Sequence, residues 1–187
     1  GRDRDIALEL YDRRITDMSR SGRPDLLLLS GTRETTLTEQ DWATIERFVR
    51  EDRGVVLFEH AGGGDGGVFT ATMEQAAMDR FGTPVRSAVR TSVVTGKELP
   101  GAVDCTRVQW TPYSIMEVFG AAETAPRLRC LEVDGHPAVF FSRVDLSHAL
   151  LDHPRWGIHG YDHDSATDLM SNLLLYGVTR RPNGTAP

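Results

Sequence analysis

Two short, uninterrupted apolar runs constrain the fold of this chain more than any other feature. Residues 26–29 read Leu-Leu-Leu-Leu, and residues 55–58 read Val-Val-Leu-Phe. Apolar runs of this length, with no polar residue alternating through them, are typical of strands buried on both faces. Such strands occur in parallel sheets that helices cover on both sides. The two runs therefore predict the centre of an α/β fold.

The segment between the two runs carries the signals of a helix. Thr38 is a favourable capping residue, and Asp41 stands three positions later, where a capping box usually has Glu or Gln. Leu37 is placed to pack against Trp42 as a hydrophobic staple. One face of this helix is apolar and contains Trp42, Ile45, Phe48 and Val49. A strand, a helix and a strand in this order predict a parallel pair joined by a right-handed crossover.

Further elements continue the alternation of strands and helices. A helix is expected over 68–81, with Gly82 as its end. A β-hairpin is expected near 128–142, because Asp134-Gly135 separates two β-prone runs. The last helix has an apolar stripe, formed by Ala166, Leu169, Met170, Leu173 and Leu174. Its expected cap is Ser165 or Asp164.

The chain ends and the middle of the chain are less regular. Residues 5–20 have the apolar spacing of an amphipathic helix. Residues 83–126 contain short β-prone pieces, such as 91–95, and are expected to form a strand and an irregular excursion. We expect one domain over 1–180 and a disordered tail over 181–187. The predicted fold class is α/β, with three layers and a doubly wound, mainly parallel sheet.

Composition excludes some classes of function. The net charge is −6, whereas a nucleic-acid binder needs a basic face. No stretch approaches the roughly 20 apolar residues that cross a bilayer, so this fragment is not expected to insert into a membrane. Its first residues show no signal peptide and suggest a fragment excised from a longer protein. Cys105 and Cys130 lack a CxxC spacing and favour two unlinked thiols, with a single bridge as the alternative.

A ligand site is expected where the parallel strands end, because ligands of open α/β sheets bind beyond the carboxyl ends of the strands. Three segments should reach that edge: 30–33, 59–67 and 142–145. The glycine-rich segment matches neither of the common phosphate-binding motifs, and Glu59 and Asp65 would repel phosphate. It is either a binding loop or simply a flexible connection.

Glu59 and His60 are the most reactive pair at this edge. A carboxylate beside an imidazole suits acid–base chemistry or metal binding, but adjacent strand residues point to opposite faces. The turn after the second strand holds neither Ser nor Cys, so a nucleophile elbow is not expected. The candidate pocket comprises Glu59, His60, Gly62, Gly63, Asp145 and His148.

Histidines gather in the last third of the chain, interleaved with aspartates. Imidazole with carboxylate suits a divalent transition metal, and the candidate ligands are His148, His153, His159 and His163. None of the recognised zinc spacings is present, and solvated loop histidines are the alternative. Asp145 is also placed to cap a short helix over 146–151.

Residues 24–177 resemble a bacterial domain family of unknown function, numbered 4159, in the class I glutamine amidotransferase-like superfamily. The segments that carry the resemblance are 24–31, 37–58, 135–147 and 164–177. The resemblance implies a flavodoxin-like sheet, no established activity, and a place in a larger, often envelope-associated protein. The family's first strand is missing here, and Glu59-His60-Ala61 replaces the acidic residues and cysteine that often follow the second strand. Amidotransferase activity is therefore not expected.

Two functions remain open. The leading hypothesis is a non-catalytic binding or interaction module of a larger bacterial protein, whose partners are other domains of that protein or, through an open sheet edge, a second copy. The alternative is a metal-dependent hydrolase, or an enzyme for a small molecule or carbohydrate, which uses Glu59, His60 and the C-terminal histidines. The compartment of the parent protein does not follow from the sequence.

Overall fold

A five-stranded sheet forms the middle layer of the computed structural model, which describes residues 14–15, 24–62, 67–120, 122–152 and 155–180. The strands are β1 (Leu26–Gly31), β2 (Val55–His60), β3 (Arg86–Ser87), β4 (Leu128–Val133) and β5 (His136–Ser142), in the order β1-β2-β5-β4-β3. β1, β2 and β5 are parallel neighbours, and β4 runs antiparallel to β5 and to β3. The expected α/β class and the parallel pair are confirmed.

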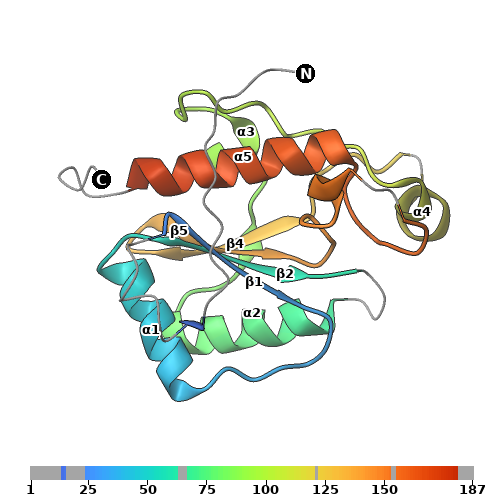
Figure 1. Cartoon of the computed structure of the whole chain (residues 1–187). Helices are drawn as coiled ribbons and strands as arrows, with labels where there is room; N and C mark the ends of the chain where they lie inside the picture. The colour runs from blue at the N-terminus through green and yellow to red at the C-terminus, as the bar shows by residue number, and fades with distance from the viewer. Residues whose placement is uncertain (1–13, 16–23, 63–66, 121, 153–154, 181–187) are drawn as a thin grey trace.

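Helices cover the sheet on both faces (Figure 1). α1 (Glu39–Arg50) and α2 (Val68–Phe81) lie on one face, and α5 (His163–Arg180) with the short α3 (Ser92–Thr95) lies on the other. The short segments α4 (Pro112–Ser114), η2 (Ile115–Phe119) and η3 (Ala149–Leu151) complete the described elements. No described helix has both the length and the apolar character that a membrane crossing requires.

The core has two halves, because the central strands bury both of their faces. In β2, Val55 and Leu57 pack in the half that faces α5, whereas Val56 and Phe58 pack in the half that faces α1 and α2. All six residues of β2 are buried. The uninterrupted apolar run at 55–58 is therefore explained by burial from two sides. The same prediction was wrong for the run at 26–29: β1 is the edge strand of the sheet, none of its residues is fully buried, and Leu28 is 40% exposed.

Two local predictions are confirmed in detail. Thr38 caps α1, and its backbone N–H is bound by the carboxylate of Asp41 at 3.0 Å, so Asp completes the capping box. In the β4–β5 hairpin, Asp134 and Gly135 have φ angles of 53° and 79°. Two successive left-handed residues match the twist of a two-residue hairpin turn, which explains the Asp-Gly pair.

Three local predictions were wrong in position or type. The strand expected within 83–126 is present as β3, but the β-prone residues 91–95 form the four-residue helix α3. Val93 and Val94 bury against α5, and Gly96 ends the turn with a φ of 67°. α5 begins at His163, and Asp162 takes the capping role by accepting the N–H of Ser165 at 2.9 Å.

The third correction concerns the short helix predicted over 146–151. Only Ala149–Leu151 form a helical turn, of the 3-10 type. Ahead of this turn, the N–H groups of Leu146 and Ser147 donate to Glu59, and that of His148 donates to Asp145. The predicted helix over 5–20 and the tail over 181–187 lie outside the described residues, apart from Arg14 and Ile15.

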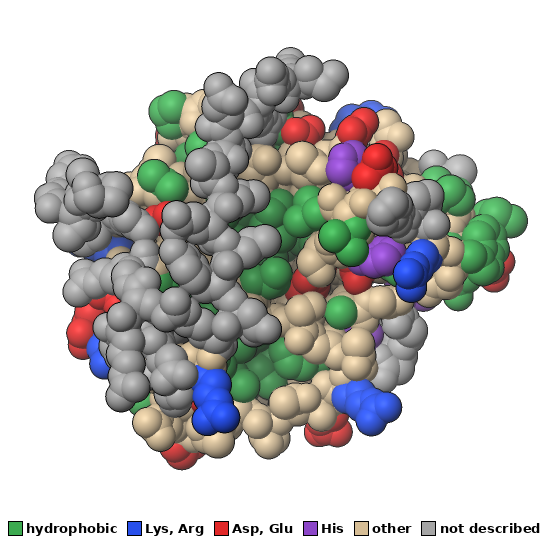
Figure 2. All heavy atoms as spheres, in the orientation of Figure 1, with side chains coloured by type: hydrophobic (Ala, Val, Ile, Leu, Met, Phe, Trp, Pro, Cys, Tyr) green, Lys and Arg blue, Asp and Glu red, His purple; other side chains and the backbone are tan. Residues whose placement is uncertain are grey.

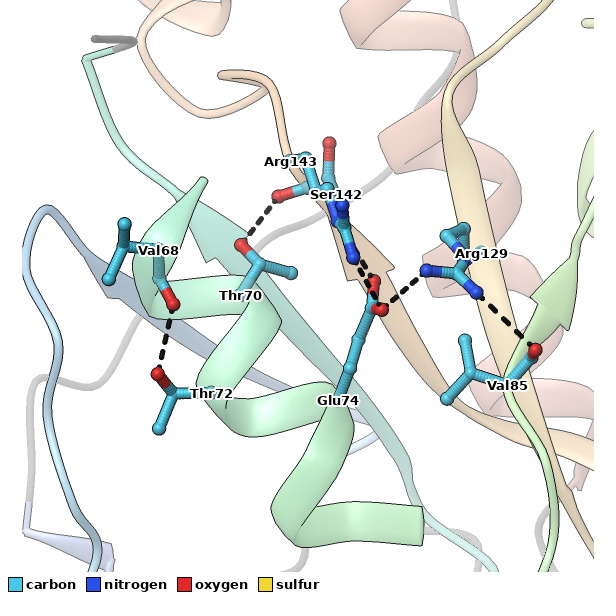
Figure 3. A network of polar contacts seen from close by, with 8 residues as sticks. All are labelled: Val68, Thr70, Thr72, Glu74, Val85, Arg129, Ser142 and Arg143. Atoms are coloured by element: carbon cyan, nitrogen blue, oxygen red, sulfur yellow. Dashed lines mark hydrogen bonds and ion pairs between the residues drawn. The ribbon is translucent and has the colours of Figure 1, made fainter. Parts of the chain in front are cut away.

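A buried carboxylate ties α2 to the sheet (Figure 3). Glu74 of α2 forms ion pairs with Arg129 of β4 and with Arg143, which follows β5, the latter at 2.9 Å. Nearby, the hydroxyl of Thr70 donates to the carbonyl of Ser142 at 3.1 Å. These bonds fix the start of α2 beside the end of β5, next to the expected site.

Candidate functional site

The carboxyl ends of β1, β2 and β5 meet at one edge of the sheet, as the sequence predicts. The register pairs Ser30 with Glu59 and Glu59 with Ser142. The hydroxyl of Ser30 donates to Oε2 of Glu59 at 3.2 Å. Glu59 therefore stands at the centre of this edge, between the two flanking strands.

Glu59 is completely buried and holds the loop that follows β5. Its Oε1 accepts the backbone N–H groups of Leu146 and Ser147, the second at 2.6 Å. Burial raises the pKa of Glu59, and the nearby Asp145 raises it further, while the bonds from Ser147 and Leu146 act in the opposite direction. The carboxylate is engaged with the protein backbone and does not face an open cleft.

Asp145 is the second loop anchor. Its Oδ2 accepts the N–H of Gly62 at 2.6 Å, and its Oδ1 accepts the N–H of His148 at 2.7 Å. Its own backbone N–H donates to the carbonyl of His159 at 2.8 Å. A β-carbon at Gly160 would lie 2.7 Å from the Asp145 carbonyl, so glycine permits this close approach. Asp145 thus joins the loops after β2 and β5 to the segment before α5.

His60 does not share the side of Glu59. Successive strand residues alternate in direction, so His60 follows the face of Phe58 and Glu59 follows the face of Leu57. His60 is buried. Burial lowers the pKa of His159, and the neighbouring His60 lowers it further, which places the two imidazoles in one electrostatic environment.

A cavity of about 460 Å³ lies beside these anchors, between the loop after β5, the start of α4 and the start of α5. Histidine and acidic side chains gather on this side of the molecule (Figure 2). Of the predicted pocket residues, Asp145 and His148 line the cavity, Glu59, His60 and Gly62 do not, and Gly63 lies outside the described residues. The full lining is Thr111, Pro112, Asp145, His148, Ala149, Asp152, Arg155, Ile158, Gly160, Tyr161, Asp162, His163 and Asp164.

The predicted metal ligands are only partly brought together. His148 and His163 line the cavity, and Nδ1 of His163 lies 2.8 Å from the carbonyl of Ala149 and 4.0 Å from a carboxylate oxygen of Asp152. His159 instead lies against the ring of Tyr113, with a centroid distance of 5.0 Å. His153 is outside the described residues. Among the residues that are described, no three His, Cys, Asp or Glu side chains are grouped as a metal site requires.

Some lining residues were missed by sequence reasoning. The aspartates 152, 162 and 164 were visible as partners of the histidines, but Thr111 and Pro112 gave no signal. Thr111 reaches the cavity because its hydroxyl donates to the carbonyl of Ile158 and Trp110 pairs with Tyr161 in an isolated bridge. These contacts join segments about fifty residues apart, which no local pattern reveals.

The cysteines lie in the core and away from this edge. Cys105 and Cys130 are both buried, and neither forms a disulfide, which confirms the prediction of two unlinked thiols. Burial raises the pKa of the Cys130 thiol to about 11. A thiol with this pKa stays protonated at neutral pH and is a poor nucleophile.

Comparison with known proteins does not extend these findings. No protein-family model matches the chain, and no curated protein matches it. Membership of family 4159 therefore stays a prediction, and the function has to be inferred from the site.

Proposed function

We propose that this chain is a non-catalytic binding module of a larger bacterial protein, with its ligand site in the cavity of about 460 Å³ beside the loop after β5. One observation carries the proposal. The two carboxylates best placed for acid–base chemistry, Glu59 and Asp145, each accept two backbone N–H groups. Both carboxylates hold the loop after β5 in place, Asp145 also lines the cavity, and the cavity itself is left open beside them.

The lining of the cavity favours a cationic ligand. Asp152 and Asp164 add negative charge to that of the anchor Asp145 and the cap Asp162, and Arg155 is the one arginine of the lining. Asp152 and Asp164 are not needed to hold the loop after β5 in the described contacts. Because carboxylates attract cations and accept hydrogen bonds, a small amine fits this lining better than a phosphate.

The test is calorimetric titration with a small diamine, putrescine, at low salt. We expect saturable binding that weakens about fivefold in Asp152→Asn, near the upper end of what the loss of one exposed charge pair costs. Asp152 has a φ of 51°, a conformation that Asn adopts readily, so the variant should fold normally.

The matched control is Asp134→Asn. Asp134 has a similar φ of 53° but lies in the β4–β5 turn, outside the cavity lining. It loses the same charge in the same backbone conformation and should bind putrescine like the wild type. Equal weakening in both variants, or no saturable binding, would contradict the cationic ligand site.

The alternative, a metal-dependent hydrolase or another small-molecule or carbohydrate enzyme, has one specific observation in its favour. His148, His163 and Asp152 line the same cavity, although Glu59 and His60 do not. Titration of untagged protein with zinc distinguishes the two functions. One-site binding that His163→Gln abolishes would support the metal enzyme, and undiminished binding in that variant would count against it.

The resemblance to family 4159 supports the remaining parts of the proposal. It favours a flavodoxin-like, amidotransferase-like superfamily for this fold and an envelope-associated bacterial parent protein whose other domains are partners. The β1-β2-β5 order of parallel strands is compatible with that superfamily. The strand that would precede Leu26 in the family would be the natural neighbour of β1.

A further inference from the structure

A second, larger cavity lies at the opposite end of the sheet. It has a volume of about 600 Å³, which is within the usual range for small-molecule sites. His136 and Pro137, at the start of β5, contribute to its lining, whereas Asp145 follows the end of the same strand in the first cavity. The two cavities are therefore separated by the length of β5.

The charges around this second cavity are balanced. Its lining contains two arginines and two glutamates, Arg86, Arg90, Glu98 and Glu132. Arg86 and Glu132 form an ion pair at 3.1 Å and so neutralise each other. Within the part of the chain that the structure describes, neither Arg90 nor Glu98 has a hydrogen bond or an ion pair. One uncommitted cation and one uncommitted anion thus line the same cavity.

The backbone holds Glu98 in an uncommon conformation. Its φ is 60°, in the left-handed region that costs a residue other than glycine about 1 kcal/mol. The neighbouring residues hold this turn in place: Leu99 is buried, and the N–H of Lys97 donates to the hydroxyl of Thr95. The surrounding chain therefore maintains a strained residue at the rim of a cavity.

The inner wall of the cavity is neutral. Burial raises the pKa of Tyr176, and its hydroxyl donates to the carbonyl of Pro137 at 2.9 Å. The Cys130 thiol is protonated at neutral pH, as described above. Ser87 and Thr91 add hydroxyl groups to the lining. Arg180 is not among the lining residues, and its guanidinium donates to the Pro137 carbonyl at 2.7 Å and to the Tyr176 hydroxyl at 3.3 Å. Among the described lining residues, the charged side chains without an ion-pair partner are therefore Arg90 and Glu98.

We propose that this cavity binds a small zwitterion, whose carboxylate pairs with Arg90 and whose ammonium group pairs with Glu98. The balance of charge carries the inference. A simple anion could pair with Arg90 but would be repelled by Glu98, and a simple cation could pair with Glu98 but would be repelled by Arg90. A ligand with both charges and no net charge satisfies the two uncommitted groups at once, and its alkyl part can lie against Leu99 and the ring of Tyr176.

The experiment uses linear amino acids in which the distance between the ammonium and carboxylate groups increases: glycine, β-alanine, 4-aminobutyrate and 6-aminohexanoate. Titration calorimetry on the full chain should show saturable binding of at least one member. Acetate and ethylamine, which carry one charge each, should bind at least fivefold more weakly than that member. Both target residues are exposed, so Arg90→Gln and Glu98→Gln should fold normally.

Each of these two variants should weaken binding of the preferred amino acid about fivefold. The control is Arg155→Gln, which removes an arginine charge from the first cavity and should leave this binding unchanged. The proposal is overturned if no member of the series binds, if acetate or ethylamine binds as well as the amino acid, or if either target variant binds normally.

Discussion

Glu59 illustrates how a residue that looks reactive in the sequence can serve the architecture. Its carboxylate lies at the end of a buried strand, where catalytic groups are common in this class of fold. However, it accepts two N–H groups of the following loop and the hydroxyl of Ser30. The cost of burying a carboxylate is offset in this way by hydrogen bonds to backbone groups that would otherwise be unsatisfied.

We predict that Glu59→Ala destabilises the protein far more than Glu59→Gln. Alanine leaves the N–H groups of Leu146 and Ser147 without their acceptor, which should lower the free energy of unfolding by about 3 kcal/mol. Glutamine keeps one acceptor oxygen for these groups and should cost about 1 kcal/mol. Urea denaturation at pH 7 measures both values, and equal losses would contradict the anchoring role.

The pH dependence of stability provides a second readout for the same residue. Because the pKa of Glu59 is raised in the folded state, its contribution to stability is present below about pH 4.5 and is lost as pH rises through the raised pKa. Glu59→Gln cannot titrate, so its stability relative to the wild type should improve over that interval. Denaturation curves between pH 4 and pH 8 test this, and parallel profiles would show that the pKa is not raised.

The roles of these residues could be predicted only in part. The edge position of Glu59 and Asp145 follows from strand patterns, and both belong to the predicted pocket. Whether their oxygens face a ligand or the backbone depends on the path of residues 145–148, which lie more than eighty positions from Glu59. The spacing of hydrophobic residues along the chain does not reveal a contact between segments so far apart in the sequence.

At the scale of elements, α5 shows how tertiary contact overrides helix propensity. Gly177 lies inside this helix, where alanine would normally be preferred by about 1 kcal/mol. A β-carbon at this position would lie 2.5 Å from the carbonyl oxygen of Asp25, just before β1. The glycine therefore allows the helix to approach the sheet closely.

We predict that Gly177→Ala lowers the melting temperature despite its better helix propensity. Overpacking against a backbone oxygen costs about 1–3 kcal/mol. This cost is larger than the gain of about 1 kcal/mol in helix propensity over most of that range. Val178→Ala is the control, because Val178 is 54% exposed and its truncation should change stability by less than about 0.5 kcal/mol. A higher melting temperature for Gly177→Ala would show that α5 can shift away from β1.

The type of a helix or turn was predictable wherever a strong capping or turn motif was not opposed by tertiary packing. The capping box at Thr38 and the Asp134-Gly135 turn depend on contacts within four residues, and both are confirmed. The segment 91–95 has strand-forming residues, but Val93 and Val94 gain more by packing against α5 as a helical turn. The intrinsic strand preference of these residues is weak compared with the free energy gained by burying Val93 and Val94, so the sequence alone does not predict the helical turn.

At the scale of the whole molecule, β1 is an edge of the sheet. Among the described strands it pairs only with β2, and Leu28 is 40% exposed. The strand contains neither a charged residue nor proline, which are the usual protection against pairing with another chain. This edge suits the addition of a further strand.

We predict that the isolated chain self-associates through β1 at high concentration. Light scattering over a concentration series should show a mass that rises above 20.7 kDa for the wild type and stays lower for Leu28→Lys. Val178→Lys, which adds the same charge at another exposed apolar position, is the control and should associate like the wild type. A monomer at every concentration would contradict this form of association.

The sequence by itself determined the α/β class, the parallel β1–β2 pair, the hairpin and the edge at which the carboxyl ends of the parallel strands meet. These features follow from periodicity, capping and turn chemistry, which act between residues close in the chain. Tertiary structure alone decided that β5 lies beside β2, that Glu59 and Asp145 bind backbone, and that two cavities open at opposite ends of β5. The reason is physical: a cavity and its charges are set by which distant segments pack together, and that choice minimises the free energy of the whole chain.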